Sequence, residues 1–211
     1  MAKTSKTSIV GKTVVRFGIP LVLGGAGYVA VISQYEDGAR FQNTVYSDKL
    51  AGGLPTACLG ITKHVSPVPV ILGDYWSDEK CTEIGSTVLQ GGQAKVLDCI
   101  KVPATQGILD SFSSHGHNVG EPSTCVSRAM GLLNQQQYER ACDALAHKAD
   151  GKTPAWSYVK TGKRNAQGGW EYRYVRGLYT RRLDERRKCL EGVAELRAQY
   201  EFKSGTWWGK P

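Results

Sequence analysis

Two acidic residues near the start of the chain, Glu36 and Asp48, are candidates for catalysis because a pair of carboxyl groups can hydrolyse a glycosidic bond. In that reaction one carboxyl group protonates the leaving oxygen, and the other activates water or stabilises the positive charge that develops on the sugar. The two residues are 12 positions apart and precede a stretch of glycine and small polar residues at 51–62, AGGLPTACLGIT. Most acidic residues are solvated surface groups, so the pair needs support from the rest of the sequence.

The elements that would position these residues follow from composition and periodicity. Residues 46–73 are rich in glycine, proline, valine and threonine, which predicts short strands and turns. From Ser77 onward the periodicity becomes helical, and a serine followed by acidic residues is typical of a helix start. Pro154 and the glycines at 162, 168 and 169 predict a polar loop before the last helix. Further helices are expected at residues 106–114, 125–133, 136–148 and 178–200.

The N-terminal region has the pattern of a weak membrane anchor. Residues 1–16 carry four basic and no acidic side chains, and residues 17–32, FGIPLVLGGAGYVAVI, carry no charge. By the positive-inside rule the basic flank would stay in the cytoplasm and the chain after Ser33 would be exported. The run is short for a span and is diluted by glycine and proline, so it would hold the membrane weakly. The alternatives are a cleaved signal peptide and a buried glycine-rich helix of a cytosolic protein.

Composition and cysteine count are consistent with an exported folded domain. The chain has 211 residues, 41% of them hydrophobic, and a formal net charge of +8, which favours polyanionic partners such as nucleic acid, anionic lipid or cell wall. Six cysteines, an even number without a CxxC motif, are typical of disulfides formed in an oxidising compartment. The alternative is a set of reduced, buried thiols in a cytosolic protein.

Several stretches in the same order resemble the phage lysozyme (endolysin) family, glycoside hydrolases of family 24, and within it the signal-anchor-release type. The resemblance covers most of the chain from the apolar segment to Leu190. The matching pieces are Glu-x-Gly at 36–38, Tyr-x-Asp at 46–48, TACLGIT at 56–62, HNVG at 117–120, ACDAL at 141–145 and GLYTRRLDERRKCL at 177–190. Two departures from the family pattern are the longer intervals from residue 36 to 48 to 56, and Cys58 where glycine is frequent.

The resemblance implies a role for each candidate site residue. Glu36 would be the general acid, Asp48 would orient or deprotonate water, and Thr56 would position that water on the opposite face of the sugar. Thr62 is the alternative to Thr56, and Asp37 is the alternative to Glu36. In relatives the residue that matches Arg181 packs an ion pair against the catalytic glutamate. We expect no metal and no cofactor.

The resemblance also implies an architecture. The fold would be α+β and lysozyme-like, with a small β lobe, a larger helical lobe and an N-terminal membrane-anchor helix. Residues 1–33 would form the basic N-terminus and anchor, and residues 34–211 the catalytic domain. The implied disulfides are Cys142 with Cys189, Cys58 with Cys81, and Cys99 with Cys125.

The implied biology is lysis of a bacterial host. The substrate would be peptidoglycan, cleaved between N-acetylmuramic acid and N-acetylglucosamine by a monomer that binds no nucleic acid. The protein would first sit in the host inner membrane facing the periplasm and would then be released to the periplasm. Because Glu36 follows the apolar segment so closely, tethering would hold activity back. An alternative from another class is a membrane-tethered periplasmic protein that binds peptidoglycan without turnover.

Four other groups of residues allow competing interpretations. Cys58 and His64 suggest a Cys/His peptidase, which the even cysteine number disfavours. His115 and His117 suggest a metal site, but a two-residue spacing without thiol or acidic partners is more typical of a turn. Residues 181–188, RRLDERRK, mix charges in the way of a solvated helix face, apart from Arg181. Trp207 and Trp208 near the C-terminus receive no role.

Overall fold

The computed structural model describes residues 11–35, 42–49, 51–58 and 60–199. The chain divides into two compact units, which are described separately. Of the described residues, the first unit contains those within 11–14 and 22–94, and the second contains those within 15–21 and 95–199. One hairpin near the N-terminus, β1 (Lys12–Arg16) with β2 (Ile19–Leu23), contributes residues to both units, as does the helix α2 (Asp78–Cys99).

The first unit is built around a small antiparallel sheet. Its strands β3 (Gln42–Asp48), β4 (Leu54–Cys58) and β5 (Ile61–Thr62) pair in sequence order, as expected for short strands separated by tight turns. The unit also contains α1 (Ala26–Tyr35) and the N-terminal part of α2. The sheet and α2 share one apolar core, whose buried members are Val45, Ala57, Cys58, Ile61, Val70, Trp76, Cys81 and Val88.

A glycine pair makes the turn between β3 and β4 possible. Gly52 and Gly53 have φ values of 69° and 86°, in the left-handed region that side chains with a Cβ rarely enter. The Gly53 amide donates to the Asp48 carbonyl at 2.7 Å and closes the turn. On the far end of β4, the disulfide Cys58–Cys81 joins the strand to α2. The strand that carries Thr56 is therefore held at both ends.

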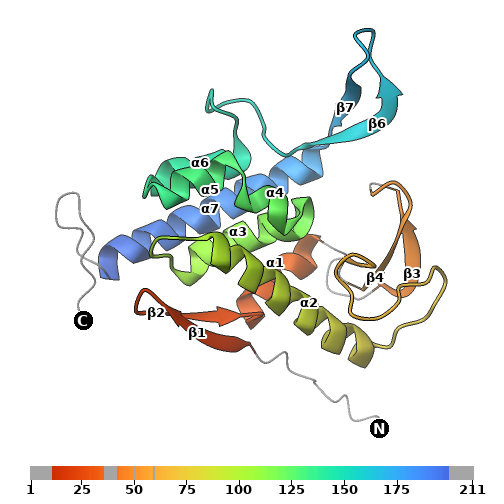
Figure 1. Ribbon diagram of the computed structural model, residues 1–211, viewed down its shortest axis with the longest axis horizontal. Helices are drawn as coiled ribbons and strands as arrows, with labels where there is room; N and C mark the ends of the chain where they lie inside the picture. Colours follow the sequence, from red (N-terminus) through yellow and green to blue (C-terminus); the bar gives the residue numbers. More distant parts are fainter. Residues whose placement is uncertain (1–10, 36–41, 50, 59, 200–211) are drawn as a thin grey trace. The chain divides into compact units, whose positions relative to one another are not determined.

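The second unit is mainly helical (Figure 1). Its helix α3 (Gln106–Val119) is buried from Ile108 to Gly116, as is expected of a helix surrounded by others. Helix α7 packs against α3 and α6, and α5 packs against α6. The bounds of the remaining helices are α4 (Glu121–Cys125), α5 (Arg128–Asn134), α6 (Tyr138–Ala146) and α7 (Arg176–Gln199).

Small residues and disulfides hold these helices together. Helices α3 and α7 approach closely at Gly192, where an added Cβ would lie only 2.7 Å from the Ile108 amide nitrogen. The Thr105 hydroxyl donates to the Gly192 carbonyl at 2.9 Å across the same contact. The disulfide Cys142–Cys189 joins α6 to α7, and Cys99–Cys125 joins the end of α2 to α4. All three expected disulfides are confirmed.

The expected helices are present, but the expected polar loop before the last helix is wrong. Residues 158–174 form a β-hairpin of strands β6 (Tyr158–Arg164) and β7 (Trp170–Tyr174), which extends away from the helices of its unit (Figure 1). The strands are rich in tyrosine, tryptophan, valine and threonine, which favour a pleated backbone. Of the glycines that suggested a loop, Gly168 and Gly169 occupy the turn, where the Asn165 amide donates to the Gly169 carbonyl, and Gly162 lies within β6.

The structure does not show one apolar helix over the expected anchor segment, residues 17–32. Phe17 and Gly18, with φ values of 53° and 75°, turn the chain between β1 and β2, and Gly24, at 64°, separates β2 from α1. Left-handed residues at these positions interrupt a helix. Across the described residues, no helix has both the length and the apolar character that a membrane span needs.

Candidate active site

The β3–β4 hairpin places Asp48 and Thr56 on one face of the sheet. Asp48 is paired with Leu54, and Tyr46 with Thr56, in the antiparallel register. Because residues two apart on a strand point to the same side, the Asp48 and Thr56 side chains are diagonal neighbours on that face. Cα atoms at such positions are typically about 7–8 Å apart.

The two candidate threonines are cross-strand partners. Thr56 on β4 lies directly opposite Thr62 on β5, so both side chains belong to the same face as Asp48. Thr56 is only 2% exposed and donates its hydroxyl proton to the Leu54 carbonyl at 3.0 Å, whereas Thr62 is partly exposed. Its lone pairs leave the Thr56 oxygen able to accept a hydrogen bond while its proton is engaged.

The Asp48 carboxylate takes part in the turn. Its Oδ1 accepts a hydrogen bond from the Ala51 amide at 3.3 Å, and its side chain is partly exposed. The expected acid, Glu36, and its alternative, Asp37, lie outside the described residues, which stop at Tyr35, the end of α1, and resume at Gln42. The structure therefore brings Asp48, Thr56 and Thr62 together.

The alternative interpretation of Cys58 as a peptidase nucleophile is wrong. Cys58 is bonded to Cys81 and is fully buried, so it has no thiolate to attack a substrate. His64, its expected partner in such a mechanism, is exposed on the surface of the first unit. These two residues contribute no peptidase site.

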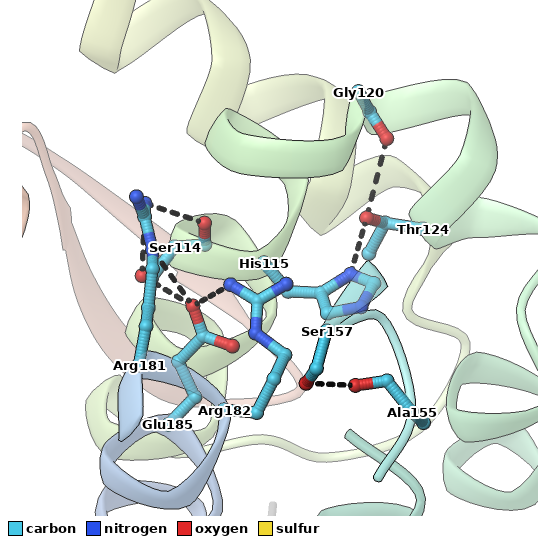
Figure 2. Close-up of polar contacts among 9 residues, drawn as sticks. All are labelled: Ser114, His115, Gly120, Thr124, Ala155, Ser157, Arg181, Arg182 and Glu185. Atoms are coloured by element: carbon cyan, nitrogen blue, oxygen red, sulfur yellow. Dashed lines mark hydrogen bonds and ion pairs between the residues drawn. The ribbon is translucent and has the colours of Figure 1, made fainter. Parts of the chain in front are cut away.

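The second unit contains a buried ionic cluster around Glu185 (Figure 2). Its Oε1 accepts hydrogen bonds from Arg182 at 2.6 Å, from the Ser114 hydroxyl at 2.7 Å and from Arg181 at 3.3 Å. Arg181 also donates to the Ser114 carbonyl at 3.0 Å. Burial raises the pKa of the Glu185 carboxyl, and the two guanidinium groups oppose that rise. Two cations share one anion, so removal of the carboxylate charge would be costly.

His115 is next to this cluster and is neutral. In Figure 2 the Arg182 guanidinium lies between Glu185 and the His115 ring. Burial, then the positive charges of Arg182 and Arg181, hold the pKa of His115 well below its usual value. The Thr124 hydroxyl oxygen lies 2.8 Å from His115 Nδ1 and 3.2 Å from the Gly120 carbonyl oxygen. His115 and His117 lie in α3, rather than in a turn.

The expectation of a solvated face at residues 181–188 is wrong for two residues. Arg182 and Glu185 are 0% and 2% exposed. Their spacing was the missed signal, since it continues a stripe of small and apolar residues at three- and four-residue intervals. The other buried members of that stripe on α7 are Arg181, Cys189, Gly192, Val193 and Leu196. The expected contact of Arg181 with Glu36 cannot be placed, because Glu36 lies outside the described residues.

The chain is similar to known proteins of one family. The phage lysozyme family model matches residues 37–185. A SAR-endolysin of Pseudomonas phage phiKMV is 28% identical over 169 residues, which cover 80% of this chain and 91% of that protein. The endolysin of Salmonella phage P22 is 32% identical over 120 residues, which cover 56% of this chain and 80% of that protein.

Solved structures show the same lysozyme-like mixture of helix and sheet. An endolysin from Escherichia coli O157:H7 phage FAHEc1 superimposes with a TM-score of 0.62 at 22% identity, and the match covers 79% of this chain and 92% of that one. At this identity the likeness concerns the fold alone. The family match, in contrast, covers the β3–β4 hairpin and continues to Glu185. The chain therefore belongs to the phage lysozyme family.

Proposed function

We propose that this protein is an endolysin that hydrolyses the β-1,4 bond between N-acetylmuramic acid and N-acetylglucosamine of peptidoglycan, and so lyses the bacterial host. The match of the phage lysozyme family to residues 37–185 is the observation that carries the proposal. The endolysins of phages phiKMV and P22 support it as relatives. The enzyme is a muramidase of glycoside hydrolase family 24.

The proposed mechanism assigns one step to each candidate residue. Glu36 donates a proton to the leaving glycosidic oxygen. The residues of the β3–β4 hairpin have a different task. Asp48 and Thr56 act on one water molecule, with the carboxylate accepting its proton and the hydroxyl oxygen orienting it. Their position on a common face supports this division of work. Direct attack by water inverts the anomeric carbon, and it requires carboxyl groups far enough apart to admit that water.

Hydrolysis has a direct test on purified murein. In a zymogram the wild-type protein should clear the opaque substrate and release new reducing ends, without new free amino groups. Reducing ends report cleavage of a glycosidic bond, whereas amino groups would report cleavage of the peptide part. A protein that co-sediments with murein but leaves the gel opaque would support the binding protein without turnover and overturn the proposed hydrolysis.

We further propose signal-anchor-release regulation of this enzyme. Residues 1–33 act as the basic flank and weak anchor, and residues 34–211 as the catalytic domain, exported to the periplasmic side. The name of the phiKMV relative, SAR-endolysin, supports the proposal, as does the absence of charge from residues 17–32. While residues 17–32 remain in the inner membrane, Glu36 is only four positions from the span and cannot reach the substrate beside Asp48 and Thr56. Release permits activity.

A permanent anchor should therefore inactivate the enzyme. Replacing residues 17–32 by a strongly hydrophobic, non-releasing span is expected to abolish lysis of a Gram-negative host culture, measured as loss of turbidity. The matched control is the wild-type protein produced at the same level, in which residues 17–32 can leave the bilayer. The control should lyse. Equal lysis by both proteins would disprove inhibition by tethering.

A further inference from the structure

The β6–β7 hairpin and the segment before it concentrate aromatic and basic side chains that the proposed hydrolysis does not use. The register pairs Tyr158 with Tyr174, Lys160 with Tyr172, and Arg164 with Trp170. Cross-strand partners share a face, so one face of the hairpin carries all six side chains. The Arg164 guanidinium lies 3.8 Å from the centre of the Trp170 ring and Lys160 Nζ lies 5.1 Å from it, which confirms this arrangement.

These side chains border a hollow in the second unit. Lys148, Trp156, Tyr158 and Tyr172 line a volume of about 490 Å³. Lys148 and Trp156 also line a second hollow of about 360 Å³, whose other walls include Arg128. Both volumes are in the range of small-molecule sites. We call the continuous feature formed by Arg128, Lys148, Trp156, Tyr158 and Tyr172 the hairpin groove.

The central side chain of the hairpin groove is held in place from behind. Trp156 has a φ of 53°, uncommon for a residue with a Cβ, and is 40% exposed while its neighbours Ala155 and Ser157 are buried. The Ser157 hydroxyl donates to the Ala155 carbonyl at 2.8 Å (Figure 2). The His115 ring packs edge-on against Trp156, with 5.0 Å between the ring centroids. An aromatic wall that is already fixed loses little entropy when a ligand stacks on it.

The charge around the hairpin groove specifies the ligand further. Residues 148–176 contain seven basic and two acidic side chains, a net +5 of the +8 carried by the whole chain. Such a concentration attracts anions. Aromatic faces stack on the C–H faces of sugar rings, and ammonium groups pair with carboxylates. A glycan that carries carboxylates at regular intervals satisfies both requirements, and the stem peptides give peptidoglycan that character.

We propose that the hairpin groove is a peptidoglycan-binding site made of other residues than the proposed catalytic ones, with sugar rings on Trp156 and Tyr172 and a stem-peptide carboxylate at Lys148. The assignment rests on the proposed function for its choice of glycan. A membrane surface fits less well, because the hairpin turn, residues 165–169 (NAQGG), has no large apolar side chain to insert.

Co-sedimentation with purified, insoluble murein tests this site. Full-length protein carrying Glu36→Gln would be used, so that the substrate is not consumed, and Tyr172→Ala and Lys148→Gln would be added separately. Each is expected to weaken binding about fivefold or more, as loss of an important contact does. The matched control is Lys163→Gln, which removes the same charge from an exposed residue on the opposite face of β6 and should change binding less than twofold. Thermal melting confirms that all variants are folded.

One modified ligand, amidated murein, and one alternative ligand, phosphatidylglycerol vesicles, separate the possible sources of binding. Murein whose carboxylates have been amidated should bind the protein with an unsubstituted groove more weakly. On this ligand Lys148→Gln should no longer reduce the affinity, whereas Tyr172→Ala should still reduce it. Equal losses for Lys148→Gln and Lys163→Gln would overturn the groove. So would a groove-dependent loss of binding to phosphatidylglycerol vesicles with binding to murein unchanged.

Clearing of murein measures hydrolysis independently of the co-sedimentation that measures binding. If wild-type protein fails to clear murein but the groove variants still lose affinity, the proposed hydrolysis fails and the groove stands. If murein is cleared but all variants sediment alike, the groove fails and hydrolysis stands.

Discussion

Glu36→Gln is expected to abolish clearing of murein, with a rate at least about 100-fold below that of the wild-type protein, because Glu36 is the proposed general acid and general acid catalysis contributes roughly 100-fold to 10,000-fold to such reactions. Glutamine keeps the size and polarity of the side chain but has no proton to give to the leaving oxygen. The measurement is release of reducing ends from purified murein under initial-rate conditions. Binding to murein should persist, since substitution removes a proton donor and leaves the binding surface in place.

Asp37→Asn is the control for this prediction. It removes one negative charge from the adjacent position, so general effects of charge in this segment appear in both variants. We expect Asp37→Asn to retain most of the wild-type rate and Glu36→Gln to lose it. The reverse result would assign the acid to Asp37, and full activity of both variants would exclude a carboxyl group at either position.

Glu185→Gln lowers the stability of the fold by roughly 3–5 kcal/mol, the usual effect of removing one partner from a buried ion pair. Glutamine is nearly isosteric, so the loss reports the charge rather than a cavity. Arg181 and Arg182, 3% and 0% exposed, would then keep positive charges in the interior without the carboxylate that binds both. At about 2–4 °C per kcal/mol for a chain of this size, the melting temperature should fall by about 6–20 °C.

Glu191→Gln provides the comparison on the same helix. Glu191 pairs with Arg187 at 2.7 Å, but both side chains are more than 60% exposed. An exposed pair of this spacing contributes about 0.3–0.5 kcal/mol, so the melting temperature should change by no more than about 2 °C. If Glu185→Gln has the same melting temperature as Glu191→Gln, another group must neutralise the two buried guanidinium groups, and the cluster is not held together by Glu185.

Local patterns in the sequence were sufficient for the helices and for one part of the candidate site. Ser77 predicted the start of α2, whose Lys80 amide donates to the Ser77 hydroxyl oxygen at 3.3 Å. The spacing of apolar residues predicted the helices of the second unit, because helical periodicity repeats within a few residues. The glycine-rich stretch before Thr56 predicted the turn that puts Asp48 and Thr56 on one face, since only residues near each other in sequence take part.

The resemblance to a family supplied what local patterns cannot. Six cysteines allow fifteen disulfide pairings, and periodicity does not choose among them. The pairings Cys58–Cys81, Cys99–Cys125 and Cys142–Cys189 were implied by where the family fold brings the helices, and they are present in the structure. They depend on which helices meet, a property of the whole fold.

Tertiary structure alone decided the burial of charge and the form of two segments. Arg182 and Glu185 are charged residues in a stretch that is typical of an exposed helix face. They are buried beside Ser114 because α7 packs against α3. The turn-forming glycines of residues 158–174 are compatible with either a loop or a hairpin. Pairing between the strands selects the hairpin. Residues 17–32 have the hydrophobicity of a weak anchor, yet in the folded chain they form a strand and part of a helix. Hydrophobicity sets how strongly a segment avoids water, whereas the partner that covers it is set by the rest of the fold.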